Sequence, residues 1–144
     1  MCFERRCNLC PDRPPDSKLG LLLDFDGTIT EKDIGNLIVS RFAAPGWEIA
    51  YESFQRGEIL ARELWEFQIE HLIKERELCS VNYALQEAQI RPGLTELVEF
   101  CENYDIPVEI VSSGLRYYVE ALLFNFGLDN RLSIACPTVT YDSN

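Results

Sequence analysis

An apolar run ends abruptly in two carboxylates and a glycine at Leu21-Leu22-Leu23-Asp24-Phe25-Asp26-Gly27-Thr28-Ile29-Thr30. Three leucines followed by a turn signal are typical of a strand in a parallel sheet whose two faces are both covered. We therefore expect a strand from Leu21 to Phe25. Open α/β sheets bind ligands beyond the carboxyl ends of their strands, so this run predicts an α/β fold with Asp24 and Asp26 at the ligand edge.

The spacing of Asp24 and Asp26 favours a shared reaction centre. Side chains two residues apart in an extended chain point the same way, so the two carboxylates are expected to converge while Phe25 packs away from them. One carboxylate then stays ionised as a nucleophile or metal ligand, and the other, with a raised pKa, carries a proton to a leaving group. Gly27 allows a positive φ or a close approach to a ligand, with loop amides free for an anion. The alternative is a polar strand end with an Asp-Gly turn.

A second strand is predicted at Val108 to Val111, and it ends in Ser112-Ser113-Gly114. An amphipathic helix is expected before it, from Leu94 to Cys101, and another directly after it, from Leu115 to Phe126. This order is typical of a parallel α/β sheet. Serine hydroxyls and free amides at a helix N-terminus form an anion site, although the same residues are also common helix caps.

The segment between the two strands has the apolar spacing of helices. Residues 32–90 predict a compact helical bundle, with interruptions at Pro45-Gly46 and Gly57. We interpret His71, on an apolar stripe, as a packing residue. Asp33 opens the first of these helices, where an acidic residue favours the N-terminus. Contact of Asp33 with a cationic or hydroxyl group of a substrate is the alternative.

Composition limits the classes of function. The chain has 144 residues, 47% hydrophobic and 26% charged, which suits one globular domain. Its net charge of −11 argues against nucleic acid and anionic membranes as partners. No apolar run is long enough for a membrane span and the first residues lack the apolar core of a signal peptide, so we expect a cytoplasmic location.

Residues 1–18 are predicted to be an irregular arm. Cys7 and Cys10 are expected not to bind a metal ion, because no second metal-binding pair follows them.

The string from Asp24 to Thr28 resembles, at every position, the first signature motif of the haloacid dehalogenase superfamily of phosphotransferases, Asp-x-Asp-Gly-Thr. Ser112 aligns with the second motif, a Ser or Thr that ends a strand. Residues 32–90 resemble the helical cap that the first subclass inserts between these motifs. The resemblance narrows to the phosphoserine-phosphatase-like group, and within it to the methionine-salvage branch that acts on 2-hydroxy-3-keto-5-methylthiopentenyl-1-phosphate; it is carried by Phe42 to Trp47, Ile106-Pro107 and Ser112 to Tyr118.

The resemblance implies a Mg²⁺-dependent phosphomonoester phosphatase that acts on a small phosphorylated metabolite through an aspartyl-phosphate. Asp24 is then the nucleophile and Asp26 the general acid and base, while Mg²⁺ binds the Asp24 carboxylate and the Asp26 carbonyl. The phosphate-binding positions are Phe25, Gly27, Thr28, Ser112, Ser113 and Gly114, and Asp33 is a candidate for substrate specificity. The implied division is an α/β core at 19–31 and 91–144 with a cap at 32–90.

Two further motifs of that family have no counterpart in these 144 residues. One is a lysine that binds the phosphate, and no lysine follows Lys74. The other is an acidic loop that completes the Mg²⁺ site, and after Ser112 the only carboxylates are Glu120, Asp129 and Asp142. We therefore expect a truncated core that is nearly inactive by itself.

The missing motifs also affect the sheet. In that family a later strand covers the free edge of the first strand, and an uncovered edge favours self-association. The alternative function is a catalytically inactive or regulatory module that binds phosphate or a partner protein. A receiver domain phosphorylated on aspartate is disfavoured by the cap-sized insertion and by Asp26-Gly27-Thr28.

Overall fold

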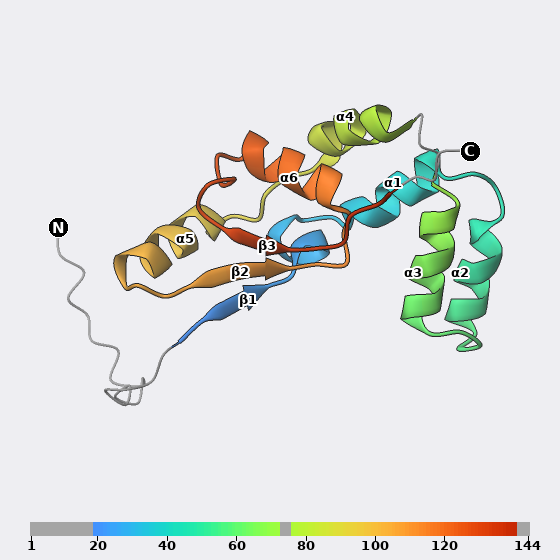
Figure 1. The fold of residues 1–144 in the computed structure, drawn as a ribbon, viewed down its shortest axis with the longest axis horizontal. Coiled ribbons are helices and arrows are strands. Elements are labelled where there is room, and N and C mark those ends of the chain that lie inside the picture. The colour runs from blue at the N-terminus through green and yellow to red at the C-terminus, as the bar shows by residue number, and fades with distance from the viewer. Residues whose placement is uncertain (1–18, 73–75, 141–144) are drawn as a thin grey trace.

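A three-stranded parallel sheet forms the centre of the molecule in the computed structural model, which describes residues 19–72 and 76–140 (Figure 1). Its order is β1 (Leu21–Leu23), β2 (Val108–Val111) and β3 (Ser133–Ala135). The predicted α/β fold is confirmed. β1 is shorter than expected because the chain leaves the sheet at Asp24 and coils into a short helical turn, η1 (Phe25–Ile29).

Six further helices accompany this sheet in the described part of the chain. Each has the hydrophobic spacing that the sequence predicts, and Gly127, at φ 71°, follows the last of them. Their bounds are α1 (Ile34–Phe42), α2 (Trp47–Gln55), α3 (Ala61–Glu70), α4 (Glu77–Glu87), α5 (Leu94–Asn103) and α6 (Arg116–Asn125). After β3, residues 136–140 have no regular secondary structure.

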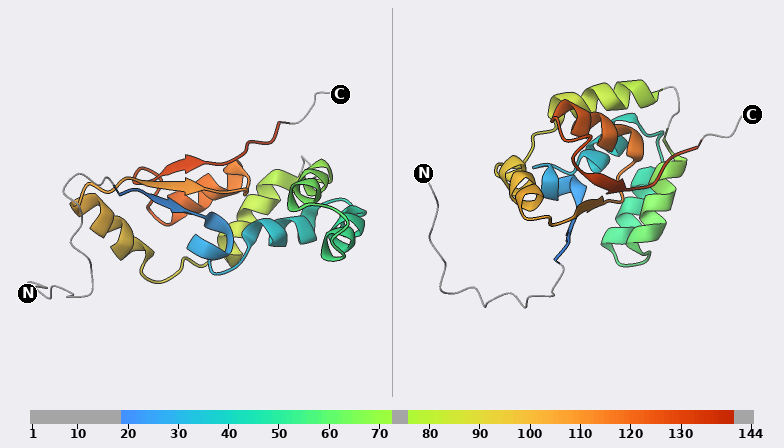
Figure 2. Two further views of the ribbon diagram at one scale, coloured as in Figure 1. Left: turned by 90° about the horizontal axis from the view of Figure 1, so that it is seen from below. Right: turned by 60° about the vertical axis from the view of Figure 1, so that its left-hand side comes forward.

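The helices that precede and follow β2 lie on one face of the sheet. α5 and α6 lie on the same side of it in both figures (Figures 1 and 2). Ile110, on that side, is fully buried, whereas Leu22 and Val111, which point the other way, are 72% and 46% exposed. The expectation of a sheet covered on both faces is therefore wrong for the described residues. β1 and β3 are the edge strands, and self-association through β1 stays a prediction.

Residues 32–90 form two parts rather than one compact bundle. α2 and α3 pack against each other as a hairpin that projects beyond the end of the sheet (Figure 1). α4 instead packs along α6 and also contacts α1. The segment is helical as predicted, while the boundaries of a cap domain stay a prediction.

The core lies between the sheet and its helices. Phe25, Ile110, Val119 and Leu122 are all fully buried there. His71 stacks on Phe67 and its Nδ1 lies 2.8 Å from the Phe67 carbonyl, in agreement with a packing role.

The remaining predictions concern cysteines and membranes. Among the described cysteines, Cys101 is buried, Cys136 is partly buried and Cys79 is exposed. The cysteines of residues 1–18 lie outside the described part of the chain. Among the described residues, the structure contains no helix with the length and apolar character that a membrane crossing requires.

Candidate active site

The loop after β1 is built around Gly27 and Thr30. Gly27 has the predicted positive φ, 74°, which turns the chain back toward β1. Its N–H is paired inside the loop, with the Lys32 carbonyl at 3.1 Å and Thr30 Oγ1 at 3.2 Å. Gly27 therefore contributes its conformation, and its amide is not free for an anion. The Thr28 hydroxyl donates to Asp24 Oδ2 at 3.0 Å, so this side chain orients the exposed Asp24 carboxylate.

Three donors hold the Asp26 carboxylate. The N–H groups of Ile34 and Gly35, at the start of α1, donate to Oδ1 at 2.9 and 3.1 Å. The Tyr118 hydroxyl, from α6, donates to Oδ2 at 2.6 Å. Burial raises the pKa of Asp26 above its usual value, and the hydrogen bond from Tyr118 opposes that rise. Asp26 is thus a fixed carboxyl group with a tendency to hold a proton.

Asp33 caps α1. Its Oδ1 accepts a hydrogen bond from the Asn36 N–H at 2.7 Å, which satisfies one of the free donors at the helix start. The capping interpretation is confirmed. The negative charge of Asp33 also contributes to the raised pKa of Asp26. A contact of Asp33 with substrate stays a prediction.

The loop after β2 packs directly against Asp26. Ser112 is buried, and its Oγ accepts a hydrogen bond from the Gly114 N–H at 2.9 Å. A Cβ on Gly114 would lie 2.6 Å from Asp26 Oδ2 and 3.0 Å from Ser112 Oγ. Glycine is required here because two loops meet with no room for a side chain. The structure thereby brings Asp26, Ser112 and Gly114 together, as the sequence predicted for the ends of neighbouring strands.

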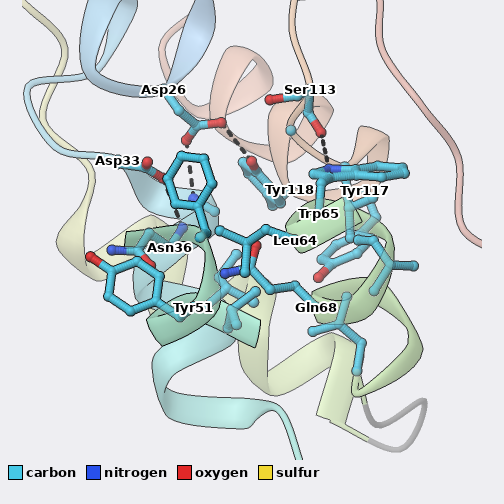
Figure 3. Close-up of a pocket in the computed structure, with 18 residues that line it drawn as sticks. Asp26, Asp33, Asn36, Tyr51, Leu64, Trp65, Gln68, Ser113, Tyr117 and Tyr118 are labelled. Atoms are coloured by element: carbon cyan, nitrogen blue, oxygen red, sulfur yellow. Dashed lines mark hydrogen bonds between the residues drawn. The ribbon is translucent and has the colours of Figure 1, made fainter. Parts of the chain in front are cut away.

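A cavity of about 320 Å³ opens between this site and the α2–α3 hairpin (Figure 3). Its polar end is formed by Asp26, Asp33, Ser113 and Gly114. Among the described residues, no lysine or arginine contributes to the lining. The rest of the lining is mostly aliphatic and aromatic, and it consists of Ile38, Val39, Tyr51, Phe54, Leu64, Trp65, Ile69, Leu72, Leu115, Tyr117 and Tyr118, with Gly35, Asn36 and Gln68. Phe25 is absent from the lining because its ring is buried in the core.

Three residues at the site were not predicted. The Tyr118 hydroxyl contacts Asp26, and the Trp65 indole N–H donates to the Ser113 carbonyl at 2.9 Å. The Arg91 guanidinium donates to the carbonyls of Thr28 and Gly27, both at 2.9 Å. Trp65 and Tyr118 lie in segments whose periodicity predicted only helices, and Arg91 lies shortly before the helix expected at Leu94. Their polar contacts reach across the fold and have no local signal in the sequence.

The donor atoms fit part of a Mg²⁺ site. Carboxylate and carbonyl oxygens, such as those of Asp24 and Asp26, are the ligands that Mg²⁺ prefers, and this ion usually keeps several waters or substrate oxygens. Within residues 19–72 and 76–140, no group of three or more acidic, cysteine or histidine side chains could hold a metal ion. Asp24 and Asp26 would supply two of the predicted ligands, and the metal site stays a prediction.

A parallel sheet with an acidic loop after the first strand and a serine loop after the second is typical of α/β proteins that bind a ligand at the carboxyl edge of the sheet. The profile of the haloacid dehalogenase-like hydrolase family matches residues 21–135. The chain belongs to this family.

Individual relatives agree with this assignment. A 2-hydroxy-3-keto-5-methylthiopentenyl-1-phosphate phosphatase from Brevibacillus brevis is 37% identical over 77% of this chain and 50% of its own length. A hydrolase of the same superfamily from Salmonella enterica serovar Typhi superposes with a TM-score of 0.70 at 17% identity, over 92% of this chain and 45% of its own. A phosphoserine phosphatase structure, described as a phospho-aspartyl intermediate analogue, superposes with a TM-score of 0.62 at 19% identity, over 88% of this chain and 59% of its own. The chain thus spans about half the length of the curated relatives it matches.

Proposed function

We propose that this chain carries the nucleophile and proton-transfer half of a Mg²⁺-dependent phosphatase that acts on a small phosphorylated metabolite. The observation that carries the proposal is the Asp26 carboxyl group. It is fixed by three hydrogen bonds, faces a cavity and touches the loop that contains Ser112 and Gly114. The relative from Brevibacillus, named as a phosphatase, supports the same reaction class.

Two half-reactions follow from these positions. The exposed Asp24 carboxylate attacks phosphorus, an Asp24–phosphate bond forms, and the ester P–O bond breaks as Asp26 gives its proton to the departing alkoxide. Water then attacks the aspartyl-phosphate while Asp26 takes up a proton from it, and inorganic phosphate leaves with Asp24 restored. The raised pKa of Asp26 supports this role, because the group must hold a proton in the first step.

The loops supply the surroundings of the phosphate. In this proposal the Ser112 hydroxyl donates to a phosphoryl oxygen, as groups at anion sites beyond strand ends commonly do. Thr28 orients the nucleophile, and Arg91 holds the carbonyls of the loop that carries it. Mg²⁺, held by the Asp24 carboxylate and the Asp26 carbonyl, would supply charge neutralisation at the phosphoryl group.

The cavity favours an ester with a small, largely apolar organic part. Its lining is aromatic and aliphatic beyond the acidic end, and it contains no cation to pair with a second phosphate or a carboxylate among the described residues. An ester of the kind named for the curated relatives, 2-hydroxy-3-keto-5-methylthiopentenyl-1-phosphate, is the substrate that we propose. A cytoplasmic location stays a prediction.

Hydrolysis of p-nitrophenyl phosphate with Mg²⁺ tests this function. The assay compares two proteins. One is the 144-residue chain, and the other, the longer version, is this chain fused to the part of the Brevibacillus relative that the chain does not span. We expect the longer version to be faster by up to about ten-thousandfold, since a missing cation and a missing metal ligand each cost about a hundredfold. Asp24→Asn should abolish turnover in both. Unchanged turnover in Asp24→Asn would contradict the assignment of the nucleophile.

A non-catalytic module is the second candidate. It is favoured by the exposure of Leu22 on an edge strand. Such a module would bind a phosphate analogue without hydrolysing esters, even in the longer version. The same assay therefore separates the two candidates.

A further inference from the structure

One hydrogen bond joins the α2–α3 hairpin to the loop after β2. The Trp65 indole N–H, on α3, donates to the Ser113 carbonyl at 2.9 Å across 48 residues of sequence (Figure 3). Trp65 also lines the cavity, so the same side chain faces the space for the organic part of a substrate. The contact thus connects the cavity wall with the loop proposed to bind phosphate.

The Ser113 carbonyl and the Gly114 N–H belong to one rigid peptide unit. A trans peptide is planar, and its C=O and N–H point in opposite directions. Here the oxygen accepts from Trp65, and the N–H donates to Ser112 Oγ at 2.9 Å. Rotating this unit would break both hydrogen bonds together. Trp65 and Ser112 therefore hold it from opposite ends.

The remaining freedom of this unit is limited by packing. Gly114 lies so close to Asp26 and Tyr118 that the position of a Cβ is already occupied. Ser112 is more than nine-tenths buried, and within the described residues its Oγ makes the single hydrogen bond from Gly114. Because that bond uses an acceptor site of the oxygen, the hydroxyl proton is left to donate to a ligand.

We propose that Trp65 is a positioning residue for the phosphate loop, which fixes the Ser113–Gly114 peptide and through it the direction of the Ser112 hydroxyl. This inference rests on the proposed function. It adds that the hairpin contacting the organic part of the substrate also sets the geometry at the phosphate. Loss of the indole N–H should then weaken oxyanion binding even where the shape of the cavity is kept.

The test measures binding of tungstate, a phosphate analogue, to the 144-residue chain with Mg²⁺ by calorimetry. Trp65→Phe removes the donor, and Trp47→Phe, in the same hairpin but outside the cavity lining, is the matched control. We expect about a tenfold loss of affinity in Trp65→Phe, which corresponds to about 1.4 kcal/mol, and less than a twofold change in Trp47→Phe. Circular dichroism checks that each variant is folded.

An isosteric replacement separates the hydrogen bond from ring packing. In the Trp47→Phe background, benzothienylalanine at position 65 replaces the indole N–H by sulfur and keeps the shape. The proposal requires the same loss of affinity as in Trp65→Phe, together with a shift of the Gly114 amide resonance. Wild-type affinity in this variant would overturn the proposal and leave the proposed function standing. Absence of tungstate binding in the unmodified chain would overturn both.

Discussion

The Tyr118 hydroxyl donates a 2.6 Å hydrogen bond to Asp26 Oδ2, and this contact ties α6 to the loop after β1. The other oxygen of the same carboxylate accepts two N–H groups from the start of α1. The start of α1, close to Asp26 in sequence, and α6, 92 residues away, therefore converge on this carboxylate. The hydroxyl of Tyr118 stays protonated, because burial and the neighbouring Asp26 charge both raise its pKa.

The raised pKa of Asp26 predicts how stability changes with pH. The folded state favours the protonated carboxyl group, so stability is lost as pH rises from about 4, the usual value, through the raised pKa. Asp26→Asn keeps the network, since its oxygen accepts from α1 and its amide donates to Tyr118. We expect this variant to be more stable than the unmodified chain at pH 7, with the difference vanishing near pH 4.

Thermal unfolding between pH 3 and 8, in a chelator to exclude metal ions, measures this difference. Asp129→Asn, at an exposed position, is the control. A difference between Asp26→Asn and the unmodified chain that grows toward low pH would contradict the predicted sign.

Gly114→Ala tests the close packing of the two loops. The new methyl group would overlap Asp26 and Tyr118, so we expect a loss of about 1–3 kcal/mol in the free energy of unfolding. Gly20→Ala is the control, because its nearest neighbour would lie at 3.6 Å, and it should change stability by less than about 0.5 kcal/mol. Urea denaturation gives both values. Equal stabilities would show that the loops separate more easily than the structure indicates.

Arg91→Lys tests the support of the loop that carries Asp24. Lysine keeps the charge but cannot donate to the carbonyls of Gly27 and Thr28 with the same planar fork. We expect tungstate to bind about fivefold more weakly, which corresponds to a loss of about 1 kcal/mol. Arg62→Lys, in an exposed ion pair with Glu66, is the control and should bind normally. An unchanged affinity in Arg91→Lys would remove Arg91 from the site.

Asp33 has two separable roles. Asp33→Ala removes the cap of α1 and should cost about 1 kcal/mol, whereas Asp33→Asn retains a capping oxygen and should cost much less. If the charge also contacts substrate, Asp33→Asn should change the relative rates among phosphate esters more than the rate on the smallest ester. A uniform change across a panel of esters, measured in the longer version, would leave only the capping role.

The sequence predicted the elements whose signals are local. β2 has the bounds expected from its β-branched run, α6 lies within the helix expected from Leu115 to Phe126, and Gly27 has the expected positive φ. The sequence also predicted the convergence of Asp26 with Ser112 and Gly114, since neighbouring parallel strands end at one edge of a sheet.

Long-range polar contacts were beyond this reasoning. Tyr118 and Asp26 are 92 residues apart, and Tyr118 had no feature that separates a buried hydroxyl from a packing aromatic ring. Arg91 lies shortly before the helix expected at Leu94, and nothing in the local sequence marked it as a contact of the loop after β1. Coverage of the sheet was also misjudged, because three leucines predict burial of a strand without showing which elements bury each face. Leu22 is the clearest example.

Beryllofluoride binding tests most directly the claim that Asp24 accepts the phosphoryl group. This fluoride complex of beryllium coordinates a carboxylate oxygen in the shape of an aspartyl-phosphate, and ¹⁹F NMR detects it without any turnover. With Mg²⁺ present, we expect a bound resonance in the unmodified chain and in Asp26→Asn, and none in Asp24→Asn. A resonance that persists in Asp24→Asn, or none in the unmodified chain, would contradict the account.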